Sequence, residues 1–157
     1  RGFEYGSQEL YERSQKDGKT MVIISIDMDN LKIVNDQFGH AQGDVALREI
    51  AAGLEYAARE GDVCARVGGD EFLVVGIDYD EEQAQQFLER FKSHLDRFNE
   101  DSGLPYLVIA SYGYYIVPED HAISLAAAIV KSDRCLYDTK RDKKARGLDM
   151  VLRENFD

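Results

Sequence analysis

Two short apolar segments with only four residues between them constrain the fold more than any other feature of this sequence. They cover residues 63–67 and 72–77, and Gly68-Gly69-Asp70-Glu71 connects them. A crossover between parallel strands needs about a dozen residues, so these segments are expected to pair as an antiparallel β-hairpin. The glycines would form its turn, and the adjacent carboxylates of Asp70 and Glu71 would lie at its tip.

Hydrophobic patterns predict the other elements. Residues 21–26 form a near-continuous, mostly β-branched run, which is typical of a strand buried on both faces. Residues 107–117 are predicted to form a long strand, and residues 150–152 a short edge strand. Five helices are predicted, at residues 1–17, 30–38, 42–60, 84–98 and 125–136. We therefore expect an α+β domain with helices packed on a largely antiparallel sheet.

Length and charge narrow the classes of function. The 157 residues correspond to about one domain. The net charge is −11, which disfavours binding to nucleic acid. Residues 131–146 are an exception, because seven basic and three acidic side chains give this segment a charge of +4. This basic segment is either a solvated helix end or lies beside a small anionic ligand.

Three further features indicate where the protein works and whether it is part of a longer chain. No apolar run approaches the roughly 18 residues of a membrane span, so we expect no membrane contact by this module. The sequence begins with Arg1 rather than Met, and we expect residues 1–157 to be a single domain of a longer protein with an N-terminal sensor or regulatory region. Cys64 and Cys135 lack the spacing of metal ligands, and both are expected to be buried, reduced thiols in the cytoplasm.

A second acidic group, Asp27 and Asp29, comes just after the apolar run 21–26. Asp29 suits the N-cap of the following helix, whereas Asp27 comes too early for that role. If this strand neighbours the hairpin, Asp27 and Asp70 approach each other and need a cation, and carboxylate oxygens suit Mg²⁺. Because Mg²⁺ commonly bridges to phosphates, the pattern indicates phosphoryl or nucleotidyl transfer. The alternative is a type I′ turn whose acidic side chains are merely solvated.

The segment after Asp29 offers groups that bind anions and purine bases. Lys32 lies in the first turn of the predicted helix, where free N–H groups favour an anion. Asn35 carries an amide and Asp44 a carboxylate, and such groups hydrogen-bond to the edge of guanine. Each has a structural alternative, because Asn35 also suits a capping position and Asp44 also suits the N-cap of the next helix.

These motifs together resemble the GGDEF domain of diguanylate cyclases. The matching residues are, in order, Asp27-Met28-Asp29-Asn30-Leu31-Lys32-Ile33-Val34-Asn35-Asp36, Phe38-Gly39-His40, Gly43-Asp44 and Arg66-Val67-Gly68-Gly69-Asp70-Glu71-Phe72. The match runs in register from Gly2-Phe3 to about Lys144, which is nearly the whole chain. The resemblance implies a palm-like α+β fold, similar to nucleotidyl cyclases, with a central, mostly antiparallel sheet flanked by helices.

The resemblance also implies a reaction. Two GTP molecules would condense to cyclic di-GMP and two pyrophosphates, with one GTP bound to each of two facing subunits. Mg²⁺, or Mn²⁺, would be held by Asp27, Asp70 and the carbonyl of Met28. Glu71 would assist the metal site or accept the proton of the attacking 3′-hydroxyl, and Lys32 would act with these acids in catalysis.

Substrate contacts are implied in the segment after the first strand, in the hairpin and in the last helix. The residues are Asn30, Leu31, Lys32, Asn35, Asp44, Gly68, Gly69, Lys140 and Lys144. Lys32 and the neighbouring backbone N–H groups would hold the triphosphate, while Asn35 and Asp44 would contact the guanine. Lys143-Lys144 stands where the family has Gly-Arg, so Lys144 keeps the positive charge without the planar guanidinium.

One further match concerns regulation. Five residues separate Arg59-Glu60-Gly61-Asp62 from Gly68, which is the spacing of the family's RxxD product site. The resemblance implies that Arg59 and Asp62 bind cyclic di-GMP and that the product inhibits the enzyme. In the alternative, these residues only terminate a helix, and Arg59 complements the helix dipole.

Two other functions compete with the cyclase. A non-catalytic module that binds GTP or cyclic di-GMP fits less well, because degenerate family members lose the hairpin acids, whereas Asp70 and Glu71 are present here. A nucleic-acid nucleotidyl transferase is disfavoured by the net charge of −11. We expect a cytoplasmic module, free or as the cytoplasmic part of a membrane protein, that forms a homodimer for catalysis.

Overall fold

Strand β1 (Met21–Met28) lies inside the sheet, and all eight of its residues are buried, as its apolar run predicts. The computed structural model describes residues 2–153. β1 pairs antiparallel with β3 (Glu71–Ile77) on one side and with β4 (Ala110–Val117) on the other. β2 (Val63–Arg66) pairs antiparallel with β3, which confirms the predicted hairpin. The strand order is therefore β2-β3-β1-β4.

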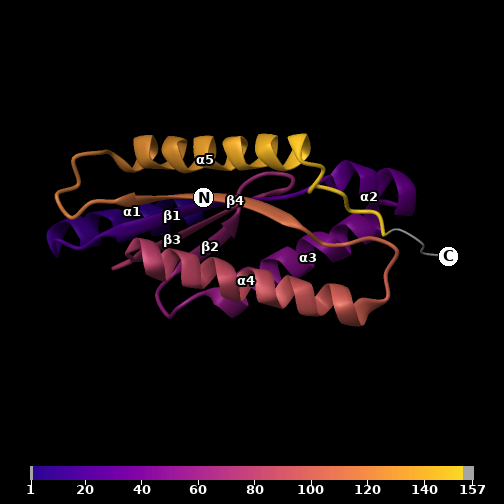
Figure 1. Cartoon of the computed structure of the whole chain (residues 1–157). Coiled ribbons are helices and arrows are strands. Elements are labelled where there is room, and N and C mark those ends of the chain that lie inside the picture. The colour runs from indigo at the N-terminus through magenta and orange to yellow at the C-terminus, as the bar shows by residue number, and fades with distance from the viewer. Residues whose placement is uncertain (1, 154–157) are drawn as a thin grey trace.

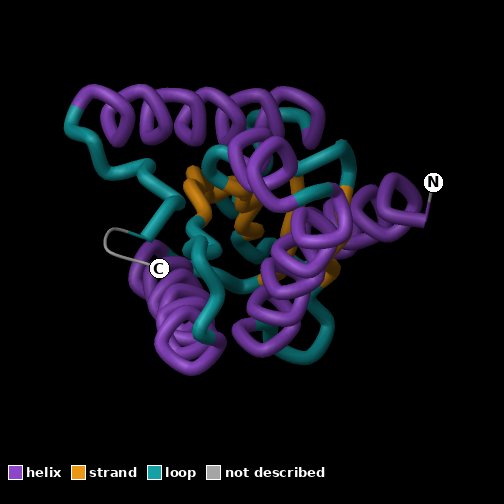
Figure 2. The backbone as a smooth tube through the Cα atoms, turned by 90° about the vertical axis from the view of Figure 1, so that its right-hand side faces the viewer, coloured by secondary structure: helices purple, strands orange, loops and turns teal. Residues whose placement is uncertain are grey.

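Helices cover both faces of this sheet (Figures 1 and 2). In the described residues they are α1 (Gly2–Lys16), α2 (Leu31–Phe38), α3 (His40–Ala57), α4 (Glu81–Ser102) and α5 (Leu125–Ala145). Because side chains of a strand alternate between faces, Ile24 and Ile26 of β1 pack in one core with residues of α3 and α4. Met21 and Ile23 pack in a second core with residues of α1 and α5. The predicted α+β architecture is confirmed.

The predicted helices are all present, with shifted boundaries, but β4 is shorter than the sequence suggests. It begins at Ala110 rather than at residue 107. The Asn99 side chain of α4 donates to the Val108 carbonyl over 3.0 Å and accepts from the Val108 N–H over 2.8 Å. These two bonds occupy the backbone groups that a longer strand would use for pairing.

The prediction of an edge strand at residues 150–152 is wrong. Leu152 forms an isolated antiparallel bridge with Tyr106, outside the four strands of the sheet. The Leu107 N–H donates to the Val151 carbonyl over 2.6 Å. This part of the chain therefore pairs with the loop before β4 and leaves the sheet with four strands.

The hairpin turn also differs from expectation. A type I′ turn needs positive φ at both central residues, and neither Gly68 nor Gly69 has positive φ. Arg66 stabilises the turn, because its Nε donates to the Gly68 carbonyl over 3.1 Å and its Nη2 to the Gly69 carbonyl over 2.6 Å. The turn that carries Asp70 is thus held by a side chain of β2.

The described helices give no candidate for a membrane span. Within residues 2–153, none is both long enough and apolar enough to cross a membrane.

Both cysteines are free thiols, as expected. Cys64 is half-buried, and burial raises its pKa to about 11, so it stays protonated. Cys135 is exposed, so the prediction that it is buried is wrong.

Candidate active site

Asp27 lies near the end of β1 and is only 8% exposed. Its Oδ2 accepts a hydrogen bond from Lys140 Nζ of α5 over 2.7 Å. Its Oδ1 is buried and has no hydrogen-bond partner among the described residues. Burial raises the pKa of Asp27 to about 6; Lys140 opposes this shift and Asp70 adds to it. The carboxylate therefore has one oxygen with unmet bonding capacity and a negative charge that an additional cation would stabilise.

The pairing of β1 with β3 brings Asp70 to Asp27. In this register Asp27 lies opposite Glu71, and the Met28 N–H donates to the Asp70 carbonyl over 3.2 Å. The Asp70 carboxyl is near enough to raise the pKa of Asp27, in addition to the larger effect of burial. Two acidic residues from separate sequence motifs thus meet at one end of the sheet, and the backbone of Met28 lies beside them.

These oxygens fit a divalent cation. Asp27, Asp70 and the carbonyl of Met28 are hard donors of the kind that Mg²⁺ prefers, and the buried Oδ1 of Asp27 lacks a partner within the described chain. In residues 2–153, no three His, Cys, Asp or Glu side chains form a metal-binding group. Mg²⁺ commonly keeps several waters and binds through one or two carboxylates plus substrate phosphates. The donor set is therefore suited to a cation that arrives with a phosphate-bearing substrate.

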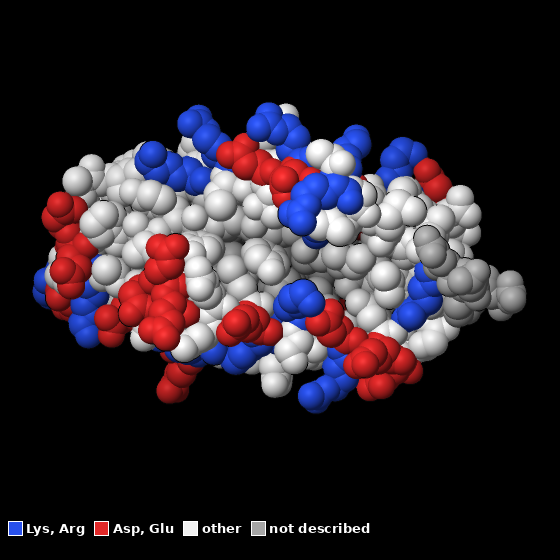
Figure 3. Space-filling model, in the orientation of Figure 1, with Lys and Arg blue, Asp and Glu red and all other residues white. Residues whose placement is uncertain are grey.

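A cavity of about 650 Å³ opens beside this acidic pair. Asp27 and Glu71 line it together with three cationic side chains of α5, Lys140, Arg141 and Lys144. Figure 3 shows Lys and Arg side chains gathered along the outer surface of α5. The basic segment predicted to lie near a small anion thus borders the carboxylates. A polyphosphate with a bound cation matches both walls of this cavity.

Asp29 does not cap α2, so that prediction is wrong. The N-cap is Asn30, which has a left-handed φ of 53° and donates from Nδ2 to the Asp149 carbonyl over 2.6 Å. The Asp29 side chain is 2% exposed; it accepts from the Ser111 hydroxyl over 2.6 Å and forms an ion pair with Lys143 of α5. A buried carboxylate needs such a partner, and this tertiary pair takes precedence over a local cap.

Lys32 is not brought to the acidic pair in this conformation. Its side chain is 86% exposed, and its Nζ lies 2.6 Å from Asp36 on the same helix. The hydrogen bond to Asp36 raises the pKa of Lys32. Such an exposed pair one helical turn apart is screened by solvent and contributes little to stability. Lys32 is therefore free to change partners at little cost.

Asn35 and Asp44, the residues predicted to contact a purine base, lie on α2 and α3, which approach each other closely. A Cβ on Gly43 would lie 1.8 Å from Asn35 Oδ1, so only glycine allows the amide to sit against α3. Asp44 is inside α3 and does not serve as its N-cap. It lines a second cavity, of about 390 Å³, whose apolar wall includes Leu47 and Phe72.

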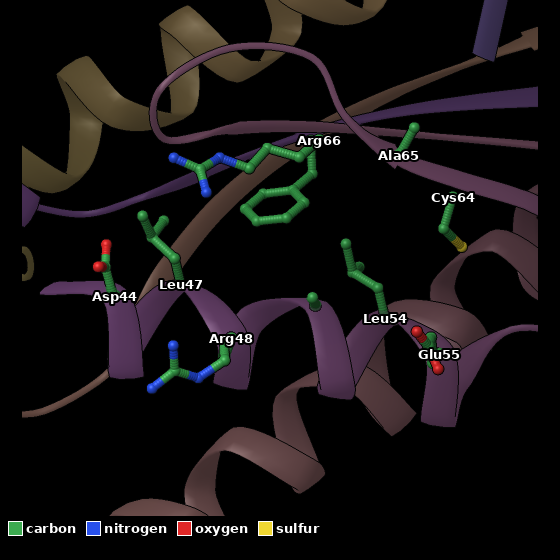
Figure 4. Close-up of a pocket in the computed structure, with 10 residues that line it drawn as sticks. Asp44, Leu47, Arg48, Leu54, Glu55, Cys64, Ala65 and Arg66 are labelled. Carbon is green, nitrogen blue, oxygen red and sulfur yellow. The ribbon is translucent and has the colours of Figure 1, made fainter. Parts of the chain in front are cut away.

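Figure 4 shows how this second cavity is arranged. Asp44 and the guanidinium of Arg66 lie at one end, Glu55 lies at the other, and Leu47 and Leu54 point from α3 toward β2. Since Arg66 holds the hairpin turn, the cavity runs from that turn along α3. Apolar walls with the Asp44 carboxylate at one end suit a planar base that offers hydrogen-bond donors.

Arg59 and Asp62 follow the end of α3 and contact each other. The Arg59 N–H donates to Asp62 Oδ2 over 2.8 Å. Both residues also contact Tyr79, whose hydroxyl donates to the same Oδ2 over 2.6 Å and whose ring lies 3.7 Å below the Arg59 guanidinium carbon. The motif is therefore more than a helix end, because both of its side chains belong to one cluster.

Lys143 and Tyr79 hold side chains near these sites in place, and the sequence patterns do not reveal either of them. Lys143 stands out only as part of the basic segment, and nothing in the sequence indicates that it pairs with Asp29. Tyr79 is an isolated aromatic residue between a strand and a helix, and it is fully buried. In both cases the partner lies in a distant element, so local patterns carry no signal.

Comparison with known sequences gives consistent matches. The family described as "Diguanylate cyclase, GGDEF domain" matches residues 1–146. The chain is 34% identical over 141 residues to a probable diguanylate cyclase, DgcJ, of Escherichia coli strain K12. This match covers 88% of the chain and 27% of DgcJ, so the chain spans about a quarter of that relative's length.

Solved structures share the fold. The diguanylate cyclase SiaD of Pseudomonas aeruginosa, in complex with its activator SiaC, has a TM-score of 0.77 at 34% identity, covering 86% of this chain and 52% of that one. A microbial GGDEF domain that interacts with cyclic di-GMP has a TM-score of 0.68 at 27% identity, covering 98% of this chain and 92% of that one. The palm-like α+β fold expected from the sequence is thus shared with these domains.

Proposed function

This chain belongs to the GGDEF domain family of diguanylate cyclases, and on that premise we propose that it condenses two GTP molecules to cyclic di-GMP and two pyrophosphates. One observation carries the proposal: Asp27 and Asp70 lie together, with a buried carboxylate oxygen that lacks a partner in the described chain. Cationic side chains of α5 line one cavity together with Asp27. This arrangement favours a cyclase over a module that only binds nucleotides, because binding alone does not require paired acids.

Asp27, Asp70 and the carbonyl of Met28 would hold Mg²⁺ or Mn²⁺. When bound, the cation supplies positive charge against the charge that develops on the α-phosphate. Lys140 and Lys144 hold the triphosphate against the acidic pair, and they stabilise the pyrophosphate as it leaves. Glu71, on the rim of the same cavity, accepts the proton of the attacking 3′-hydroxyl or orients the acidic pair.

The remaining phosphate contacts come from two turns of the chain. Backbone N–H groups of Asn30, Leu31 and Lys32 bind the terminal phosphates, and the ammonium of Lys32 exchanges Asp36 for a phosphate oxygen. This exchange costs little, because the Lys32–Asp36 pair is exposed. Gly68 and Gly69 border the phosphates from the hairpin, since no side chain there blocks close approach.

Guanine specificity would come from the second cavity. The Asp44 carboxylate accepts from the N1–H and N2–H groups of guanine, and Asn35 supplies an amide that both donates and accepts. Adenine lacks this pair of adjacent donors, so it would leave the Asp44 carboxylate unpaired. A site built to pair with a substrate's hydrogen-bonding groups discriminates strongly against analogues that lack them.

The proposed reaction requires two subunits and is regulated by its product. Two subunits face each other, each with one GTP, and the product binds at Arg59 and Asp62 to inhibit turnover. Residues 1–157 form a single domain within a longer protein, controlled by an N-terminal region and, since GTP is the substrate, working in the cytoplasm. The chain spans 27% of DgcJ, which leaves room in such relatives for other domains.

Turnover tests this proposal. The protein, fused to a dimeric coiled coil to bring two subunits together, is incubated with GTP and Mg²⁺, and products are identified by mass spectrometry. We expect cyclic di-GMP and pyrophosphate from the wild type and at least a hundredfold less from Asp70→Ala. Equal product from both proteins, or nucleotide binding with no turnover by the wild type, contradicts the proposed reaction.

A further inference from the structure

Tyr79 connects β3 to α4 and joins the two side chains of the RxxD motif. It is fully buried, and its hydroxyl donates to Asp62 Oδ2 over 2.6 Å. Its ring lies 3.7 Å from the guanidinium carbon of Arg59. A single residue outside the motif therefore contacts both residues that are proposed to bind the product.

The hydrogen bond from Tyr79 saturates one oxygen of Asp62. Oδ2 accepts from the Tyr79 hydroxyl and also from the Arg59 N–H over 2.8 Å, and a carboxylate oxygen has two lone pairs. The other oxygen, Oδ1, packs against Gly76, where a Cβ would lie only 2.4 Å away. Asp62 is thus held against β3, with little capacity left for a new donor at Oδ2.

Arg59 is held in the same way. One face of its guanidinium covers the Tyr79 ring, and its Nη2 donates to the carbonyls of Ile77 over 2.9 Å and Asp78 over 3.3 Å. The cluster therefore fixes both motif side chains through contacts within the chain.

A guanine base offers two adjacent donors, N1–H and N2–H, which together match both oxygens of one carboxylate. To accept both, Asp62 has to give up one of the two bonds at Oδ2. The bond from the Arg59 N–H belongs to a turn that is also closed by the Asp62 N–H donating to the Arg59 carbonyl over 3.0 Å, so the bond from Tyr79 is the one given up. The Tyr79 hydroxyl would then be left buried without a partner, and an unsatisfied buried donor is costly. Product binding at the motif is therefore opposed by a bond that exists only because position 79 is tyrosine.

We propose that the Tyr79–Asp62 hydrogen bond is a latch that holds the RxxD site closed and sets the concentration of cyclic di-GMP needed for inhibition. This inference rests on the product site of the proposed function. Tyr79 is a positioning residue in this account, since it acts on the product through Asp62. Burial and the neighbouring Asp62 raise the pKa of Tyr79, so its hydroxyl remains a donor throughout the neutral range.

Tyr79→Phe removes the latch and keeps the ring under Arg59. We expect cyclic di-GMP to bind this variant about tenfold more tightly in calorimetry, which corresponds to about 1.4 kcal/mol. The inhibitory concentration should fall by the same factor, while turnover at low product stays unchanged. Tyr11→Phe is the matched control, because it also removes a buried tyrosine hydroxyl, one that donates to the Ile123 carbonyl over 2.6 Å, away from the motif.

Arg59→Ala separates failure of the latch from failure of the product site. If wild-type binding depends on Arg59 and Tyr79→Phe binds equally or more weakly, the latch is wrong and the product site stands. If neither the wild type nor Tyr79→Phe shows binding that depends on Arg59, the product site itself is overturned, and the latch with it. Should Tyr79→Phe fail to fold, 3-fluorotyrosine at position 79 gives a ¹⁹F signal that must shift when product is added to the otherwise wild-type protein; an unmoved signal overturns the latch.

Discussion

Asp27 and Lys140 are 113 positions apart in the sequence, and their side chains meet at 2.7 Å between Oδ2 and Nζ. A second pair joins Asp29, the first residue after β1, to Lys143, three residues further along α5. The end of β1 is thus tied to the last turns of α5 by two ion pairs. These contacts bring the cationic helix end to the acidic pair, which is the arrangement that a metal-bound triphosphate requires.

Asp27→Asn should make the protein more stable in the presence of a chelator. The folded-state pKa of Asp27 is raised from 3.8 to about 6, so this carboxyl lowers the free energy of unfolding as pH rises through that interval. The destabilisation is complete above about pH 6 and absent below about pH 4. We expect the variant to gain about 1 kcal/mol near pH 7 and nothing near pH 4, as measured by urea unfolding. A variant less stable than the wild type near pH 7 would show that the buried Asp27 carboxylate does not destabilise the fold.

Lys143→Met should destabilise the fold far more than the loss of an exposed lysine. The side chains of Lys143 and Asp29 are 17% and 2% exposed, so the variant leaves a buried carboxylate without its cation. Breaking such a pair costs about 3 kcal/mol, whereas Lys92→Met, which removes the exposed Lys92–Asp96 pair, should cost less than about 0.5 kcal/mol. Urea unfolding of both variants provides the comparison. Equal losses would mean that the buried pair contributes no more than a surface contact.

Asp44→Asn should weaken GTP binding with a smaller effect on the chemical step. The amide replaces one acceptor oxygen with a donor that faces the N–H groups of guanine, so we expect KM for GTP to rise about tenfold to a hundredfold. Glu55→Gln, at the other end of the same cavity, is the control and should leave KM unchanged. Steady-state kinetics would refute the assignment if the two variants behaved alike.

The sequence predicts the elements that local patterns encode. The hairpin follows from four connecting residues, and the burial of β1 on both faces follows from its apolar run. The proximity of Asp27 to Asp70 follows once β1 is placed beside β3, because antiparallel register then brings the two motifs together. Local spacing is enough in these cases, since the residues concerned lie at the ends of neighbouring strands.

Contacts between residues far apart in the sequence cannot be predicted from such local patterns. Asp29 has the spacing of an N-cap, yet Lys143 and Ser111 compete for its carboxylate and determine its position. The β4 strand is shortened because Asn99, on α4, pairs with Val108. Neither contact is visible without the packing of helices on the sheet. The roles of the site residues in binding and catalysis also remain predictions, which the variants above address one at a time.

Cation binding at Asp27 and Asp70 tests the central claim most directly. Mn²⁺ is titrated into the protein with a non-hydrolysable GTP analogue, and bound metal is followed by electron paramagnetic resonance. We predict that Asp27→Asn and Asp70→Asn each weaken Mn²⁺ binding by at least about tenfold, while Asp96→Asn, in the exposed pair with Lys92, leaves it unchanged. Wild-type affinity in either Asp27→Asn or Asp70→Asn would contradict a shared metal site and, with it, the proposed chemistry.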